Sequence, residues 1–145
     1  MVERRINLKT KAEIIGEKVI KDYVKAFNER NSLKMAELFN FPHVRFANDS
    51  VSVITKSEYL KNQDKVTELL INENWDHTEI KDIQHIQSND TKAHFIIHFL
   101  RLDKDKNIIH DFKTFWIVTN INSHWGIQFR SSFLTSIAAT FGRKI

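Results

Sequence analysis

The sequence contains no cysteine and has only three glycines and one proline among its 145 residues. The lack of cysteine excludes disulfides, thiolate metal ligands and a cysteine nucleophile. Three scattered glycines cannot build a phosphate-binding loop or the Gly-x-Ser-x-Gly turn of a serine hydrolase. No apolar run approaches the ~20 residues of a membrane span, and the first residues lack the apolar core of a signal peptide. We therefore expect a cytoplasmic protein without a membrane partner.

The residues that are present have an ordinary globular balance, with 41% hydrophobic and 28% charged residues. Eleven phenylalanines and three tryptophans can fill a large aromatic core, and the length suits one domain over residues 1–145. The net charge of +4 is spread along the chain, and residues 9–30 mix lysines with glutamates. This pattern is typical of a solvated helix face, so a nucleic-acid partner is the weakest of the hypotheses considered.

The first part of the chain has helical signals. Thr10 and Glu13 form a capping-box pattern ahead of apolar residues at helical spacing, which predicts a helix over about 10–30. Ser32 is expected to cap a second, short helix. Pro42 is expected to end it, because proline cannot continue a helix.

After Pro42 the hydrophobic period changes to two, which predicts strands. Thr55 and Glu58 then repeat the capping-box pattern and predict a third helix to about residue 72. From Trp75 onward, apolar runs alternate with short polar turns, as in an antiparallel meander. The expected strands are 43–47, 51–54, 75–87, 91–102, 108–119 and 124–134. Helices followed by a sheet give an α+β fold.

Apolar residues occupy both faces of the predicted sheet. On 94–102 one face carries Phe95, Ile97 and Phe99, and the other carries Ile96, Leu100 and Leu102. Residues 111–118 show the same two-sided pattern. A sheet with one solvated face would alternate between apolar and polar residues. We therefore expect helices on one face and a second subunit on the other, in a homodimer.

Three stretches carry a resemblance to a known family: "FNFPHVRF" (39–46), "WDHTEI" (75–80) and "HWGIQFRSSF" (124–133). With the order of elements, they make the chain resemble a bacterial subgroup of the nuclear transport factor 2-like superfamily. That superfamily includes SnoaL-like polyketide cyclases, ketosteroid isomerase and scytalone dehydratase. The resemblance implies a cone-shaped α+β fold, with three N-terminal helices packed on a curved antiparallel sheet. It also implies a small-molecule pocket at the open end and frequent dimers through the sheet.

The resemblance does not fix a reaction, because this fold carries both enzymes and non-catalytic modules. Ketosteroid isomerase has its aspartate base near the first strand. Here that strand carries His43 and Arg45, and the first carboxylate, Asp49, falls in the turn. This difference speaks against ketosteroid isomerase chemistry. Scytalone dehydratase uses a His–Asp pair, and no particular pair in this sequence aligns with it.

His43 and Arg45 share one face of the first predicted strand. If that face lines the cone, Arg45 can bind a carboxylate or enolate through two parallel donors. His43, with a reference pKa near ~6.5, could then transfer a proton at neutral pH. The structural alternative is that Arg45 pairs with a carboxylate at a sheet edge while His43 bonds a backbone carbonyl.

Trp75 and His77 share a face of the next predicted strand, and an aromatic wall beside a titratable ring suits a pocket mouth. The alternative is that Trp75 anchors the start of the sheet. Arg130 lies on the last strand on the same face as Gln128 and Ser132. This polar group suits either a cavity or a subunit interface.

His94 and His98 have the i, i+4 spacing of helical zinc sites, but their surroundings predict a strand. Four residues of strand span roughly 13 Å, whereas each ligand of a zinc ion lies about 2 Å from it. We therefore expect no metal site, although His98 remains a candidate for the pocket. No cofactor is expected either.

Two functions from different classes follow. The first is the binding of a small molecule that is anionic or contains a carbonyl group. In this function the protein could also be an enzyme, a lyase or isomerase that uses general acid–base chemistry. Its ligand-binding candidates are His43, Arg45, Trp75, His77, His98 and Arg130. The second is a non-catalytic dimeric interaction module whose cone is filled by side chains.

Overall fold

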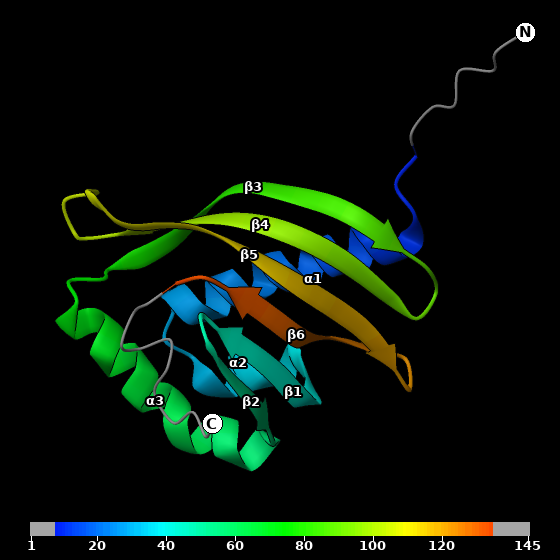
Figure 1. The fold of residues 1–145 in the computed structure, drawn as a ribbon, viewed down its shortest axis with the longest axis horizontal. Helices are drawn as coiled ribbons and strands as arrows, with labels where there is room; N and C mark the ends of the chain where they lie inside the picture. Colours follow the sequence, from blue (N-terminus) through cyan, green and yellow to red (C-terminus); the bar gives the residue numbers. More distant parts are fainter. Residues whose placement is uncertain (1–7, 135–145) are drawn as a thin grey trace, which may run out of the picture.

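A computed structural model describes residues 8–134 of the chain and shows an α+β fold (Figure 1). Its helices are α1 (Lys11–Asn28), α2 (Ser32–Glu37) and α3 (Lys56–Asn72). Its strands are β1 (Phe39–Ala47), β2 (Ser50–Ile54), β3 (His77–Ser88), β4 (Lys92–Leu102), β5 (Ile108–Ile121) and β6 (His124–Ser132). The strands form one six-stranded sheet in the order β2-β1-β6-β5-β4-β3, which arches over α1. No helix within residues 8–134 is both long enough and apolar enough to cross a membrane.

The helix starts follow the capping residues, with two corrections. Thr10 caps α1 by accepting a bond from the backbone N–H of Glu13 at 3.2 Å. The second half of the predicted capping box is not formed there, and the Glu13 carboxylate instead lies 3.2 Å from His85 on β3. The complete capping box occurs at α3, between Thr55 and Glu58. The prediction that Ser32 caps α2 is wrong, because Asn31 takes this position and accepts from the N–H of Lys34.

Pro42 does not end the second helix, which corrects another prediction. Helix α2 stops at Glu37, and β1 begins at Phe39, so Pro42 lies inside the strand. The Phe41–Pro42 peptide is cis, and the ladder between β1 and β6 shifts register between Phe39 and Val44. Proline has no N–H to give to a ladder, and here it falls in the stretch where regular pairing is interrupted.

The sheet is mixed, whereas a purely antiparallel sheet was expected. Strands β3 to β6 form the antiparallel meander that the sequence predicts. Strand β1, however, pairs with β6 in parallel and with β2 antiparallel. The β1–β2 hairpin thus extends the meander at β6, which brings β1 and β6 side by side.

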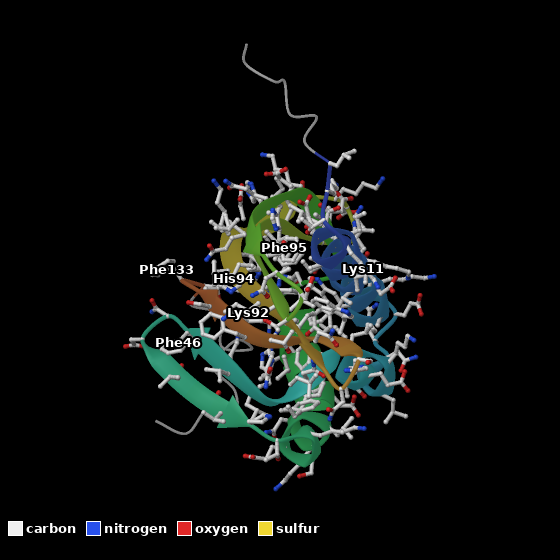
Figure 2. All side chains as sticks on the ribbon, turned by 90° about the vertical axis from the view of Figure 1, so that its right-hand side faces the viewer. Lys11, Phe46, Lys92, His94, Phe95 and Phe133 are labelled. Carbon is white, nitrogen blue, oxygen red and sulfur yellow. The ribbon has the colours of Figure 1, made fainter. Side chains whose placement is uncertain are left out.

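One face of the sheet, the inner face, packs against α1. Alternate residues of β4 on this face are buried, including Phe95 and Ile97, which have no exposed surface. Figure 2 shows Phe95 on the side towards α1 and His94 on the opposite side. Leu102 was expected on the outer face but is only 4% exposed, because a register shift between Arg101 and Leu102 reverses the alternation.

The other face of the sheet, the outer face, is also rich in apolar side chains. Its members are Val44, Phe46, Val53, Ile96, Phe115, Ile117 and Phe129, which are partly or largely exposed. Phe46 lies over Phe129, with 5.7 Å between ring centroids, and Phe129 contacts Phe115 at 6.0 Å. Figure 2 shows Phe46 on this side of the sheet. The two-sided pattern of the sequence is therefore present in the structure.

Candidate functional site

A cavity lies between α1 and the inner face of the sheet, and three arginines line it: Arg45 of β1, Arg101 of β4 and Arg130 of β6. Aromatic rings form much of the remaining wall, from Tyr23, Phe27, Phe99, Phe112 and Trp116. The cavity has a volume of about 440 Å³, including its open mouth. It therefore has room for a small organic ligand.

The strand alternation places these arginines. Arg45 and Arg130 are direct neighbours on the parallel strands β1 and β6. Arg101 lies two residues beyond Phe99 on the inner face of β4. Three positive charges on one cavity add up to a strongly positive potential inside it. The charges also repel each other, which makes the arrangement unfavourable for the protein without a ligand.

Arg130 is held in place by several contacts. Its Nε donates to His43 Nε2 at 3.0 Å, and its Nη1 donates to the hydroxyl of Tyr23 at 3.3 Å. Its guanidinium carbon lies 4.9 Å from the ring centroid of Phe39 and 5.9 Å from that of Trp116. These cation–π contacts and hydrogen bonds fix the direction of the positive charge.

His43 is completely buried and orients Arg130. An arginine N–H can only donate, so His43 Nε2 must accept, and the ring proton must sit on Nδ1. Nδ1 lies 3.2 Å from the carbonyl oxygen of Ile127, to which it therefore donates. Both ring nitrogens are engaged, which favours a neutral positioning residue over a proton-transfer group.

Arg45 points to the inner face, as the alternation of its strand predicts, and it is 6% exposed. Its Nη1 donates to the carbonyl oxygen of Phe46 at 2.8 Å and its Nη2 to the hydroxyl of Ser132 at 2.9 Å. The guanidinium is thus anchored between β1 and β6 at one side of the cavity.

The sequence patterns did not single out Arg101, yet it completes the cavity. Its Nη1 is buried and has no hydrogen-bond partner, and its guanidinium carbon lies 5.0 Å from the ring centroid of Phe112. Burial lowers the pKa of Arg101 from its usual value to about 10; the charge of Glu73 opposes this shift and that of Arg130 adds to it. The group remains cationic at neutral pH. Arg101 could have been identified by continuing the alternation of Phe95, Ile97 and Phe99 along the strand by two residues.

The other predicted site residues lie outside this cavity. Trp75 is 2% exposed and donates to the hydroxyl of Thr78 at 3.0 Å, so it anchors the sheet behind the cavity wall. His77 contacts Asp76 and Glu79 at the surface. His98 is bonded to Asp111 on the neighbouring strand, on the outer face. Of the six candidates, Arg45 and Arg130 line the cavity and His43 supports it.

The histidines at 94 and 98 both lie on β4, as expected, and pair with Ile117 and Lys113 in the ladder. Residues 8–134 contain no group of three or more histidine or acidic side chains that could hold a metal ion. The absence of a bound metal stays a prediction.

Comparison with known proteins identifies the fold. Three crystal structures are similar over most of the chain, at identities that establish the fold alone. One, an NTF-2 like protein of unknown function from Shewanella oneidensis, has a TM-score of 0.63 at 16% identity, over 80% of this chain and 93% of its own. The second, a domain of unknown function with a cystatin-like fold from Nostoc punctiforme, has a TM-score of 0.68 at 12% identity, over 86% and 78%. The third, also of cystatin-like fold and from Nostoc punctiforme, has a TM-score of 0.66 at 8% identity, over 85% and 91%.

No curated protein matches the sequence significantly. The model of one family, described as "NTF2-like protein (DUF6841)", matches residues 12–130. This range runs from the first turn of α1 to Arg130 on β6, so it includes all three arginines of the cavity. The chain therefore belongs to this family of NTF2-like proteins.

Proposed function

We propose that this protein binds a small anionic organic molecule in the cavity formed by α1 and the inner face of the sheet. The observation that carries the proposal is the convergence of Arg45, Arg101 and Arg130 on one cavity whose lining, among the described residues, includes no aspartate or glutamate. Among these arginines, the buried Nη1 of Arg101 has no hydrogen-bond acceptor, and an anionic ligand would supply both an acceptor and an opposite charge.

An enzymatic function, as a lyase or isomerase that acts on the bound molecule, is the second candidate. Its support is the contact between the Tyr23 hydroxyl and Arg130, which together could stabilise an enolate oxygen. A general base is harder to identify. His43 lies behind the cavity wall and uses both ring nitrogens within the protein, and the described lining contains no histidine. Ligand binding therefore accounts for the cavity more directly than acid–base chemistry does.

Thermal melting with a panel of small carboxylates, phosphate and their neutral analogues tests this proposal. A ligand that binds only the folded state raises the melting temperature in proportion to the logarithm of its concentration. We expect at least one anion to do so with the wild-type protein, and Arg45→Ala to remove the effect. Lys104→Ala is the matched control, because it removes the same charge from an exposed turn.

Two outcomes would contradict the proposal. One is that no anion in the panel stabilises the wild-type protein. The other is that Arg45→Ala lowers the free energy of unfolding by the ~3–5 kcal/mol of a broken buried pair but leaves anion binding unchanged, since Arg45 would then serve the fold alone.

We also propose that the protein is a homodimer that buries the outer face of the sheet. The support is the apolar surface there, where Phe46 is 40% and Val53 is 63% exposed. Phe115, Ile117 and Phe129 continue it across β5 and β6. Contiguous apolar patches of this kind are uncommon on monomers. If the protein is instead a non-catalytic interaction module, this face would be the surface through which it binds its partner.

A further inference from the structure

We infer that the ligand of this cavity is a single-ring aromatic carboxylate and that Arg101 is the residue that recognises its carboxylate. The inference rests on the proposed function, the binding of an anion in the cavity. It adds the chemical class of the ligand and the residue that selects it.

The position of the carboxylate follows from the hydrogen bonds of the three guanidinium groups. Arg45 donates to Phe46 and Ser132, and Arg130 donates to His43 and Tyr23. Arg101 differs, because its Nη1 is buried and lacks an acceptor. A buried donor without an acceptor is unfavourable, and a carboxylate oxygen would satisfy both the donor and the charge. Arg101 is therefore where the anionic group of the ligand binds.

The ligand's body is expected to be mostly apolar, because the other polar side chains of the lining already have partners within the protein. The Thr78 hydroxyl accepts from Trp75, and the Thr114 hydroxyl accepts from Trp116 while it donates to the carbonyl of Ser131. The Tyr23 hydroxyl accepts from Arg130 and keeps its own O–H to donate. A ligand carrying several hydroxyl or amide groups would find too few partners for them in this cavity.

The walls near Arg101 favour an aromatic ring. The guanidinium carbon of Arg101 lies 5.0 Å from the centroid of Phe112, which lies 5.8 Å from that of Phe99. Phe99 in turn lies 5.3 Å from Trp116. A carboxylate on Arg101 brings the group attached to it within reach of these rings, and aromatic pairs gain more than their buried area alone provides.

The size of the cavity favours a ligand with one ring. Its volume is about 440 Å³ including the open mouth, which is near the lower end of the ~300–1,000 Å³ of small-molecule sites. A flat ring that carries a carboxylate suits a space of this size better than a multi-ring skeleton does. A saturated ring is thicker than an aromatic one and should fit less well.

Isothermal titration calorimetry on the full-length protein tests this inference. The probes are benzoate, the saturated analogue cyclohexanecarboxylate, the neutral analogue benzamide, acetate and inorganic phosphate. We expect benzoate to bind at least about tenfold more tightly than each of the others. Arg101→Met, which keeps the long side chain but removes its charge, should weaken benzoate binding by at least about tenfold. Lys104→Met should leave it unchanged.

The outcomes separate this inference from the proposed function. If acetate or phosphate binds as tightly as benzoate and Arg45→Ala weakens it, the aromatic carboxylate is overturned while anion binding stands. If benzoate binds equally well to wild type and Arg101→Met, the role of Arg101 is overturned. If benzamide binds as well as benzoate, recognition of the charge is overturned. If none of the anions binds, the inference and the proposed function fail together.

Discussion

At the scale of single residues, Arg101 carries a positive charge that burial disfavours in the folded protein. Its Nη1 is buried without an acceptor, and burial lowers its pKa to about 10. A lowered pKa in a cationic group means that the folded state holds the charge less favourably than the unfolded state does. Residues that weaken the fold in this way are concentrated at functional sites.

We therefore predict that Arg101→Met stabilises the ligand-free protein. The substitution removes an unsatisfied buried donor and should raise the free energy of unfolding at pH 7 by about 1–3 kcal/mol. Chemical denaturation of both proteins measures this change. A decrease of similar size would show that Arg101 supports the fold, through its attraction to Glu73 and its contact with Phe112.

Two histidines should make stability depend on pH. Burial lowers the pKa of His94, assisted by Lys92 and His85, and burial together with Arg101 lowers the pKa of His110. The unfolded chain then takes up protons near pH 6.5 while the folded chain does not. The stabilisation is therefore complete above about pH 6.5 and is lost as the pH falls.

Denaturation curves between pH 7.5 and pH 5 measure this effect. We expect wild-type stability to fall over that range, and the double variant His94→Gln, His110→Gln to lose part of the slope. A slope unchanged by the double substitution would assign the pH dependence to other groups.

The sequence could predict part of the site at this scale. Period-two alternation correctly placed His43 and Arg45 on the inner face. It could not show that the acceptor available to Arg130 is His43, because that contact depends on the parallel pairing of β1 with β6. His77 and His98 were selected for their chemistry alone, and their faces of β3 and β4 lie outside the cavity.

At the scale of elements, the close contact between β1 and β6 depends on Gly126. A Cβ atom there would lie 2.6 Å from the carbonyl carbon of Phe39 and 2.8 Å from the backbone N of Asn40. Backbone atoms cannot move aside as the end of a side chain can. The two strands that carry Arg45 and Arg130 therefore require a residue without a side chain at this position.

We predict that Gly126→Ala lowers the free energy of unfolding by about 1–3 kcal/mol or more through overpacking. Gly16→Ala is the matched control. Its Cβ would lie 2.7 Å from the outer atoms of the Phe95 ring, which can shift, and alanine favours the helix. Thermal melting should show the larger loss for Gly126→Ala, and an equal or smaller loss would contradict this account of the β1–β6 contact.

The elements themselves were largely predictable. Capping residues and the change of hydrophobic period gave the helices within 11–72 and the meander after Trp75. The start of β1 was missed, because Pro42 is a strong helix breaker and Phe39 fits either period. The ends of α2 were decided by Asn31 and by the pairing of Phe39 with Ile127, a contact between distant parts of the chain.

At the scale of the whole molecule, apolar residues occupy both faces of the sheet. Helix α1 covers the inner face, and we propose a second subunit for the outer face. Sequence alternation could show that both faces are apolar. It could not show that β1 joins β6 in parallel, since strand order is not encoded in the hydrophobic period.

We predict that light scattering after gel filtration gives close to twice the chain mass of 17.1 kDa for the wild-type protein. Phe115→Glu places a charge in the middle of the outer face and should give the mass of a single chain. Leu33→Glu is the control, because Leu33 is 68% exposed on α2, away from that face. A wild-type monomer at micromolar concentration, or a Phe115→Glu dimer, would contradict the proposed interface.

The central claim is that the three arginines form a binding site for a small anion. A crystal structure of the protein purified from the organism that makes it, without added ligand, tests this most directly. The account predicts density for one flat molecule in the cavity, with its anionic end within hydrogen-bond distance of Arg101 Nη1 and its body among Phe99, Phe112 and Trp116. A cavity that holds only water, or an acidic side chain of the protein itself against Arg101, would contradict the account.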